Sequence, residues 1–241
     1  MLPKLVIFDY GETLAHEDDY RAKDGFDAIL SYAAENPMSA DADILFMEFS
    51  NAYYDLRREA HRIGLEMPNI RRWQWLFDIY GLKFSRSMET LEGIFWNAAA
   101  PCVPTPNVEK LLALLREKGI KTGVISNMGF SGNALKKRLK GLFPEHEFDF
   151  VISSADYILR KPNGRIFALG LKMAGCKAED AWFLGDNPRC DIQGAADAGI
   201  HPVYYDRDLG CAYRENEKIA VMPECTRVND WSELIEIIEK G

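Results

Sequence analysis

The pattern of apolar and polar residues begins with a short buried strand. Residues 5–8 (LVIF) form a continuous apolar run, which is typical of a strand that is covered on both faces of a sheet. The run ends at Asp9, and Gly11 follows with the conformational freedom that a turn requires. Open α/β sheets place their reactive groups at the carboxyl ends of parallel strands, so Asp9 is a candidate catalytic carboxylate. An aspartate that only caps a turn gives the same local pattern.

A long block without strand patterning follows. Residues 16–24 are polar and predict a loop, and from residue 25 to 101 the apolar side chains recur at helical spacing. The pattern predicts helices near residues 25–33, from Ser39 to about 62, and over 71–80 and 88–99. The short connections between these segments predict a small helical bundle.

From residue 106 to the end, helices and strands alternate. Strands are expected near residues 120–125, 148–153, 181–184 and 201–205, with helices between them and a last helix over 229–240. Such alternation predicts right-handed βαβ units on a parallel sheet. Because the first strand precedes the helical block, the block is an insertion. We therefore predict an α/β fold, with a Rossmann-like parallel-sheet core (residues 1–15 and 102–241) and an inserted α-helical cap (residues 16–101).

Composition narrows the function. The chain has 241 residues and is 47% hydrophobic and 27% charged, as is ordinary for a soluble globular protein. Its formal net charge of −8 argues against non-specific binding to nucleic acid or to an anionic membrane. No apolar run reaches the ~20 residues of a membrane helix, and the first run lacks a signal-peptide cleavage site. The scattered cysteines have no zinc-binding spacing, so we expect free thiols and a cytoplasmic location.

Polar residues with reactive side chains follow the predicted strands in a set order. They occur in the segments FDYGETL (8–14), VISN (124–127), RKPNGRIF (160–167) and LGDNPRCDIQGAADAG (184–199). In this order the segments resemble the four motifs of the haloacid dehalogenase-like (HAD) hydrolase superfamily. The helical block also lies where that family inserts a small α-helical cap. Four motifs in order are far more specific than any one of them.

The resemblance implies roles for three of these motifs. Asp9 is the expected nucleophile, attacking phosphorus to give an aspartyl-phosphate. Ser126 and the backbone N–H of Asn127 are expected to donate to a phosphate oxygen, and Lys161 to hold a positive charge beside phosphate and nucleophile. We therefore expect Asp9, Ser126 and Lys161 to be catalytic, and Ser126, Asn127 and Lys161 to bind phosphate. A strand-end hydroxyl at Ser126 and a solvated surface lysine at Lys161 are the simpler alternatives.

The fourth motif brings two carboxylates, Asp186 and Asp191, toward the same strand ends. Carboxylates beside a phosphate and Asp9 require a cation, and Mg²⁺ takes carboxylate, carbonyl, phosphate and water oxygens. We expect Asp9, Asp186 and the Gly11 carbonyl to be ligands, with Asp191 completing the metal site by supporting them. Asp191 can also cap the helix that it opens.

The acidic pair separates two branches of the family. Its dehalogenases use the same aspartate without a metal and carry small polar residues where this chain has Gly185-Asp186. We therefore predict a Mg²⁺-dependent phosphatase for a small phosphorylated metabolite, as a monomer or homodimer without nucleic-acid or membrane partners. A metal-independent dehalogenase-type hydrolase and a catalytically weakened phosphate-binding protein remain alternatives.

One position departs from the family pattern. Its phosphatases read Asp-x-Asp-Gly-Thr, and their second aspartate is the general acid and base, whereas Gly11 stands at that position here and Glu12 follows. Such an acid contributes ~10²–10⁴-fold to the rate, so slow turnover is expected unless another group replaces it. The nearby candidates for that role are Glu12, His16, Glu17 and Asp18.

The predicted cap carries a set of basic residues that could bind an anionic substrate, although a solvated helix face is the simpler explanation for most of them. These residues are Arg57, Arg58, His61, Arg62, Arg71 and Arg72. Trp73, Trp75 and Trp96 lie at helical spacing and are expected in the core of the bundle.

Overall fold

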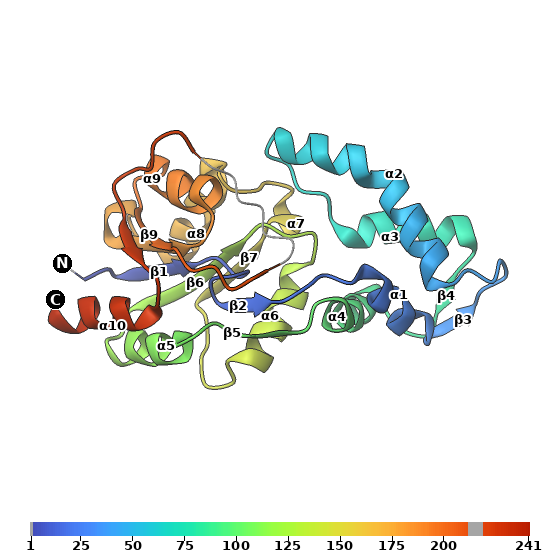
Figure 1. Cartoon of the computed structure of the whole chain (residues 1–241), viewed down its shortest axis with the longest axis horizontal. Coiled ribbons are helices and arrows are strands. Elements are labelled where there is room, and N and C mark those ends of the chain that lie inside the picture. Colours follow the sequence, from blue (N-terminus) through green and yellow to red (C-terminus); the bar gives the residue numbers. More distant parts are fainter. Residues whose placement is uncertain (1, 212–218) are drawn as a thin grey trace.

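The computed structural model describes residues 2–211 and 219–241, which build a six-stranded sheet beside a group of helices (Figure 1). The strand order is β10-β9-β8-β1-β6-β7, and all neighbours are parallel. The bounds are β1 (Leu5–Phe8), β6 (Lys121–Ser126), β7 (Phe150–Ser153), β8 (Ala181–Gly185), β9 (His201–Tyr205) and β10 (Thr226–Val228). The predicted α/β fold is confirmed.

Strand β1 lies between β6 and β8, and Phe8 is opposite Val124 on one side and Leu184 on the other. Its side chains alternate between two apolar clusters, with Val6 and Phe8 in one and Leu5 and Ile7 in the other. The first cluster is closed by α5 (Val108–Glu117), α6 (Gly132–Leu142) and α10 (Trp231–Lys240), the second by α8 (Gly164–Ala174) and α9 (Gly194–Asp197). Burial on both faces explains why the run LVIF is continuously apolar.

The inserted helices lie beside the sheet, at the right of Figure 1. They are α1 (Ala22–Leu30), α2 (Ala42–Arg62), α3 (Asn69–Tyr80) and α4 (Met88–Ala99). Phe26 packs between Phe49 and Phe95, with ring centroids 5.7 and 5.0 Å away. The ring of Trp96 stacks at 4.3 Å on Phe130, which follows β6, so the apolar cluster of the sheet continues into the helical insertion.

Several short elements differ from the prediction. The sequence does not predict two short antiparallel strand pairs, because strands of two or three residues carry no periodicity. In these pairs β2 (Ala15–Glu17) is bonded to β5 (Cys102–Pro104), and β3 (Ala33–Glu35) to β4 (Lys83–Phe84). Strand β10 was missed for the same reason. Helix α2 begins after Asp41, which accepts from the Ile44 N–H, and not after Ser39. The remaining short helices are α7 (Ser154–Tyr157), η1 (Ala178–Asp180) and the π-helical η2 (Pro188–Gln193).

The tryptophans divide unequally. Trp73 and Trp96 are buried as expected, whereas Trp75 is 38% exposed and its ring packs against Tyr53. Within the described ranges, no helix is both long and apolar enough to cross a membrane.

Two buried polar clusters tie the helical insertion to the sheet. In the first, Arg138 donates to the Tyr10 hydroxyl at 2.6 Å and pairs with Glu17 at 3.1 Å. In the second, Glu66 accepts from Arg160 at 2.6 Å and from the Ser154 hydroxyl at 2.9 Å. The backbone N–H of Glu66 also donates to the carbonyl of Ile158. The segment after α2 is therefore bonded to the loop that leads to Lys161.

Candidate active site

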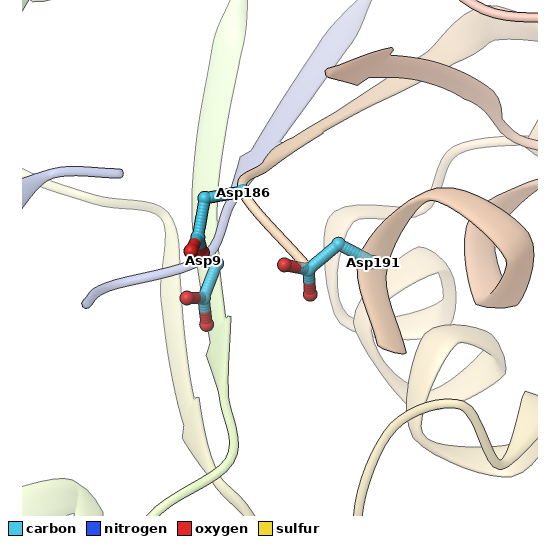
Figure 2. A group of neighbouring side chains, drawn as sticks. All are labelled: Asp9, Asp186 and Asp191. Carbon is cyan, nitrogen blue, oxygen red and sulfur yellow. The ribbon is translucent and has the colours of Figure 1, made fainter. Parts of the chain in front are cut away.

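Three aspartates meet at the carboxyl edge of the sheet. Asp9 follows β1, Asp186 follows β8, and Asp191 lies in η2. One oxygen of each carboxylate lies within 4.8 Å of the others, and Figure 2 shows the Asp191 side chain pointing toward Asp9 and Asp186. The Asp9 N–H donates to the Leu184 carbonyl at 2.8 Å, which fixes the two strand ends together. Adjacent parallel strands therefore bring together aspartates that are far apart in sequence.

Lys161 is the cation of this cluster. It is 2% exposed, and its Nζ lies 2.7 Å from Asp9 Oδ1 and 2.6 Å from Asp191 Oδ1. Asn127 holds it in place, because the Lys161 N–H donates to Asn127 Oδ1 at 2.8 Å and Asn127 Nδ2 donates back to the Lys161 carbonyl at 2.9 Å. The alternative of a solvated surface lysine is wrong.

The charges of this cluster do not balance. Burial lowers the pKa of Lys161, but the charges of Asp191 and Asp9 raise it well above its ordinary value, so the ammonium is fully charged. Burial raises the pKa of Asp191, and the neighbouring Lys161 opposes that rise. Lys161 pairs with Asp9 and Asp191, and together with Asp186 these carboxylates form a donor set of hard oxygens that suits a divalent cation.

Gly185 makes room for this arrangement. A Cβ on Gly185 would lie 2.5 Å from Asp191 Oδ2, so a side chain there would displace the carboxylate. Asp191 does not cap a helix, because it lies inside η2. Asn187 caps η2, accepting from the N–H groups of Arg189 and Cys190, while its own N–H donates to Asp191 Oδ2 at 2.9 Å. The prediction of a capping Asp191 is therefore wrong.

A cavity of about 230 Å³ opens over the aspartates. Its described walls include Asp9, Gly11, Asn127, Lys161 and Asp186. Ser126, at the end of β6, is 3% exposed and is not on the described wall, although it precedes Asn127. The other predicted site residues all line this cavity.

Comparison with known proteins agrees with the family resemblance of the four motifs. A model of the haloacid dehalogenase-like hydrolase family matches residues 3–199. The chain belongs to this family. Over 136 residues it is 36% identical to a glyceraldehyde 3-phosphate phosphatase of Methanothermobacter thermautotrophicus, covering 56% of this chain and 58% of that protein. Over 104 residues it is 34% identical to a phosphoserine phosphatase of Thermus thermophilus, covering 43% and 41%. The matches thus span about half the length of these relatives.

Solved structures of the family share the fold over the whole chain. A 2-haloacid dehalogenase from Pseudomonas syringae pv. tomato superposes with a TM-score of 0.64 at 22% identity, covering 100% of this chain and 99% of that one. A HAD phosphatase from Thermococcus onnurineus gives 0.62 at 19% identity, covering 99% and 98%. Neighbours of both chemistries share the fold, so the reaction has to be inferred from the site.

Glu12 follows Gly11, the position at which the family's phosphatases carry their general acid. Glu12 adopts a left-handed backbone (φ 54°), and its side chain is buried on the wall of the Asp9 cavity. His16 Nδ1 lies 3.0 Å from Glu12, and His16 Nε2 lies 2.7 Å from Asp18. Burial lowers the pKa of His16, but the two carboxylates raise it above its usual value overall. Of the candidates to replace the missing acid, Glu12 is the one on the described cavity wall, whereas Glu17 pairs with Arg138.

Proposed function

We propose that this protein is a Mg²⁺-dependent phosphatase that hydrolyses a small organic phosphate through an aspartyl-phosphate on Asp9. The observation that carries the proposal is the buried cluster of Asp9, Asp186 and Asp191 around Lys161. A dehalogenase-type site uses the nucleophile without a metal and carries a small polar residue where Asp186 stands here, so the carboxylate of Asp186 favours the phosphatase. The phosphatase names of the relatives agree with this choice.

The first chemical step forms a bond between an Asp9 carboxylate oxygen and phosphorus and breaks the bond from phosphorus to the departing oxygen. Lys161 holds its charge beside the attacking carboxylate and orients it, and Asn127 keeps Lys161 in position. The departing oxygen takes a proton from water, because Gly11 stands at the family's acid position, and Glu12, the carboxyl group on the described wall outside the aspartate cluster, is the candidate to replace that acid. Water then attacks phosphorus, releasing inorganic phosphate and restoring Asp9.

The residues present fit the metal. Asp9, Asp186 and the Gly11 carbonyl would hold Mg²⁺, with Asp191 supporting them, and the donor set of hard oxygens matches its preference. When bound, Mg²⁺ supplies positive charge to the phosphate oxygens. Without it, a phosphate dianion would enter a site whose acidic groups outnumber its one buried ammonium.

A panel of phosphate esters, assayed with Mg²⁺ and with EDTA, tests the proposal. We expect phosphate release that requires Mg²⁺ and is absent in the Asp9→Asn variant. Hydrolysis of 2-chloropropionate in EDTA, with no release of phosphate from any ester, would instead establish the dehalogenase reaction. Phosphate binding without turnover of any substrate would identify a weakened binding protein.

A further inference from the structure

A second cavity adjoins the aspartate site. Its volume is about 830 Å³, and it lies between helices α2 and α3 of the insertion and the loop that carries Lys161. In a chain of net charge −8, every charged residue on its described wall is basic. These residues are Arg57, Arg58, His61, Arg62, Arg72, Arg160, Lys161 and Arg189.

Some of these cations have carboxylates of their own. Arg58 pairs with Asp55 at 3.1 Å, and Arg160 pairs with Glu66. Arg57 and Arg72, by contrast, form no ion pair with any residue that the structure describes. They are therefore the cations of this wall that are available to a ligand.

Arg72 is the more unusual of the two, because it is only 7% exposed. Its guanidinium lies over the ring of Phe49 at 4.3 Å and donates to Asn69, while its buried Nε has no acceptor in the described structure. Burial, and then the charge of Arg57, lowers the pKa of Arg72 to about 10. Arg72 forms no direct ion pair in the described structure, and the charge of Glu66 raises its pKa by less than burial and Arg57 lower it, so the buried guanidinium is incompletely compensated.

The two cavities are continuous at their walls. Arg57, Arg160, Lys161 and Cys190 line both of them. A molecule that places a phosphate over Asp9 can therefore extend past Arg57 toward Arg72.

We propose that Arg57 and Arg72 bind a second anionic group of the substrate, a carboxylate or another phosphate, at the end away from the phosphate that Asp9 attacks. The inference builds on the proposed phosphatase function and narrows its substrates to phosphate esters with two anionic ends. A guanidinium matches both carboxylate and phosphate oxygens through paired N–H donors. Binding also supplies Arg72 with a direct ion pair.

Matched pairs of ligands separate the two anion types. For the carboxylate arm the pair is 3-phosphoglycerate against glycerol 3-phosphate, and for the phosphate arm it is fructose 1,6-bisphosphate against fructose 6-phosphate. We expect KM to be roughly 10- to 100-fold lower for the doubly anionic member of one pair, the range of a charge-assisted hydrogen bond. Equal KM values within both pairs would overturn the inference.

Arg72→Met and Arg57→Met should each remove that preference. KM for glycerol 3-phosphate and fructose 6-phosphate should stay unchanged in Arg72→Met, because Arg72 is not on the wall of the Asp9 cavity. Arg71→Met is the matched control, because Arg71 is on the same helix but exposed and outside both cavity walls. A merely structural Arg72 gives a different result: the melting temperature falls, and all substrates are affected alike. We expect the melting temperature of Arg72→Met to be unchanged or higher, since the substitution removes an uncompensated buried charge.

Calorimetry keeps this inference separate from the proposed reaction. In the Asp9→Asn background, affinities for the same pairs are measured with and without Arg72→Met. A preference for the doubly anionic ligand that disappears with Arg72→Met supports the subsite, even if no ester is ever hydrolysed. A preference that survives both Arg72→Met and Arg57→Met refutes it, even if the enzyme is an active phosphatase.

Discussion

Two neighbouring regions of the site carry opposite charges: the acidic sheet edge with Asp9, Asp186 and Asp191, here called the floor, and the basic cavity wall with Arg57 and Arg72, here called the roof. At the sheet edge, Asp9, Asp186 and Asp191 lie together, and Lys161 pairs with Asp9 and Asp191. In the adjoining cavity, Arg57 and Arg72 belong to a wall on which no described residue is acidic. Like charges gathered without enough counter-charge are costly, and each region is relieved by a ligand of the opposite sign. The floor therefore suits a cation and the chemistry, whereas the roof suits an anion and selects the substrate.

The largest expected effect lies at the floor. Asp9→Asn should lower kcat by at least ~10³-fold, because it removes the nucleophile while preserving the shape of the side chain. Phosphate release measures the rate, and circular dichroism checks the fold. A rate near that of the unaltered protein would mean that no aspartyl-phosphate forms on Asp9.

Removing a second carboxylate tests whether the floor binds a cation. Asp186→Ala should weaken Mg²⁺ binding by at least ~10-fold and lower activity in parallel, since it leaves Asp9 facing phosphate with less screening. Isothermal calorimetry measures the affinity. Unchanged Mg²⁺ binding in this variant would remove Asp186 from the set of ligands.

The missing acid predicts that the rate depends on the leaving group. Acyl and aryl phosphates should be hydrolysed much faster than alkyl phosphates, and Gly11→Asp should raise alkyl turnover by up to ~10²-fold. The site can accept the side chain, because Gly11 has no positive φ and a Cβ there meets no heavy atom within 4 Å. Rates that are equal across leaving groups would indicate that Glu12 supplies the proton, and Glu12→Gln should then create the dependence.

A smaller effect, on stability, is expected at Glu66, which bonds the segment after α2 to the loop that leads to Lys161. Burial raises the pKa of Glu66, but the hydrogen bond from His61 and the charge of Arg160 lower it overall to about 2. Because this carboxyl pKa is depressed in the folded state, its stabilisation is complete above the ordinary glutamate value of 4.5 and is lost as pH falls toward 2. Glu66→Gln should cost roughly 2–3 kcal/mol of unfolding free energy near neutral pH.

Urea unfolding at pH 7 and at pH 3 measures this cost. The difference in unfolding free energy between the unaltered protein and Glu66→Gln should be smaller at pH 3 than at pH 7. Glu59→Gln, at an exposed helix position, is the control. A difference that stays constant with pH would show that the charge of Glu66 does not contribute.

Much of the molecule was predictable from local pattern. The apolar run LVIF, the helix predicted over 88–99 and the strand predicted over 201–205 agree with β1, α4 and β9, because helical and buried-strand periodicity is a property of neighbouring residues. The four motifs in order also predicted which residues would surround Asp9. Their placement at the ends of parallel strands was enough to expect them at one edge.

Other features depend on contacts between distant segments, which no local pattern contains. The pairing of β2 with β5 joins residues that are far apart in the chain, and short strands have no periodicity of their own. Arg71 and Arg72 are neighbours of identical type, yet of the two only Arg72 is buried, with its guanidinium over the ring of Phe49 and no direct ion pair in the described structure. The sequence by itself determined the parallel-sheet fold and the acidic floor. Only the tertiary structure decided that Arg72, and not Arg71, is buried on the cavity wall, because burial and the lack of an ion pair arise from the packing of separate helices.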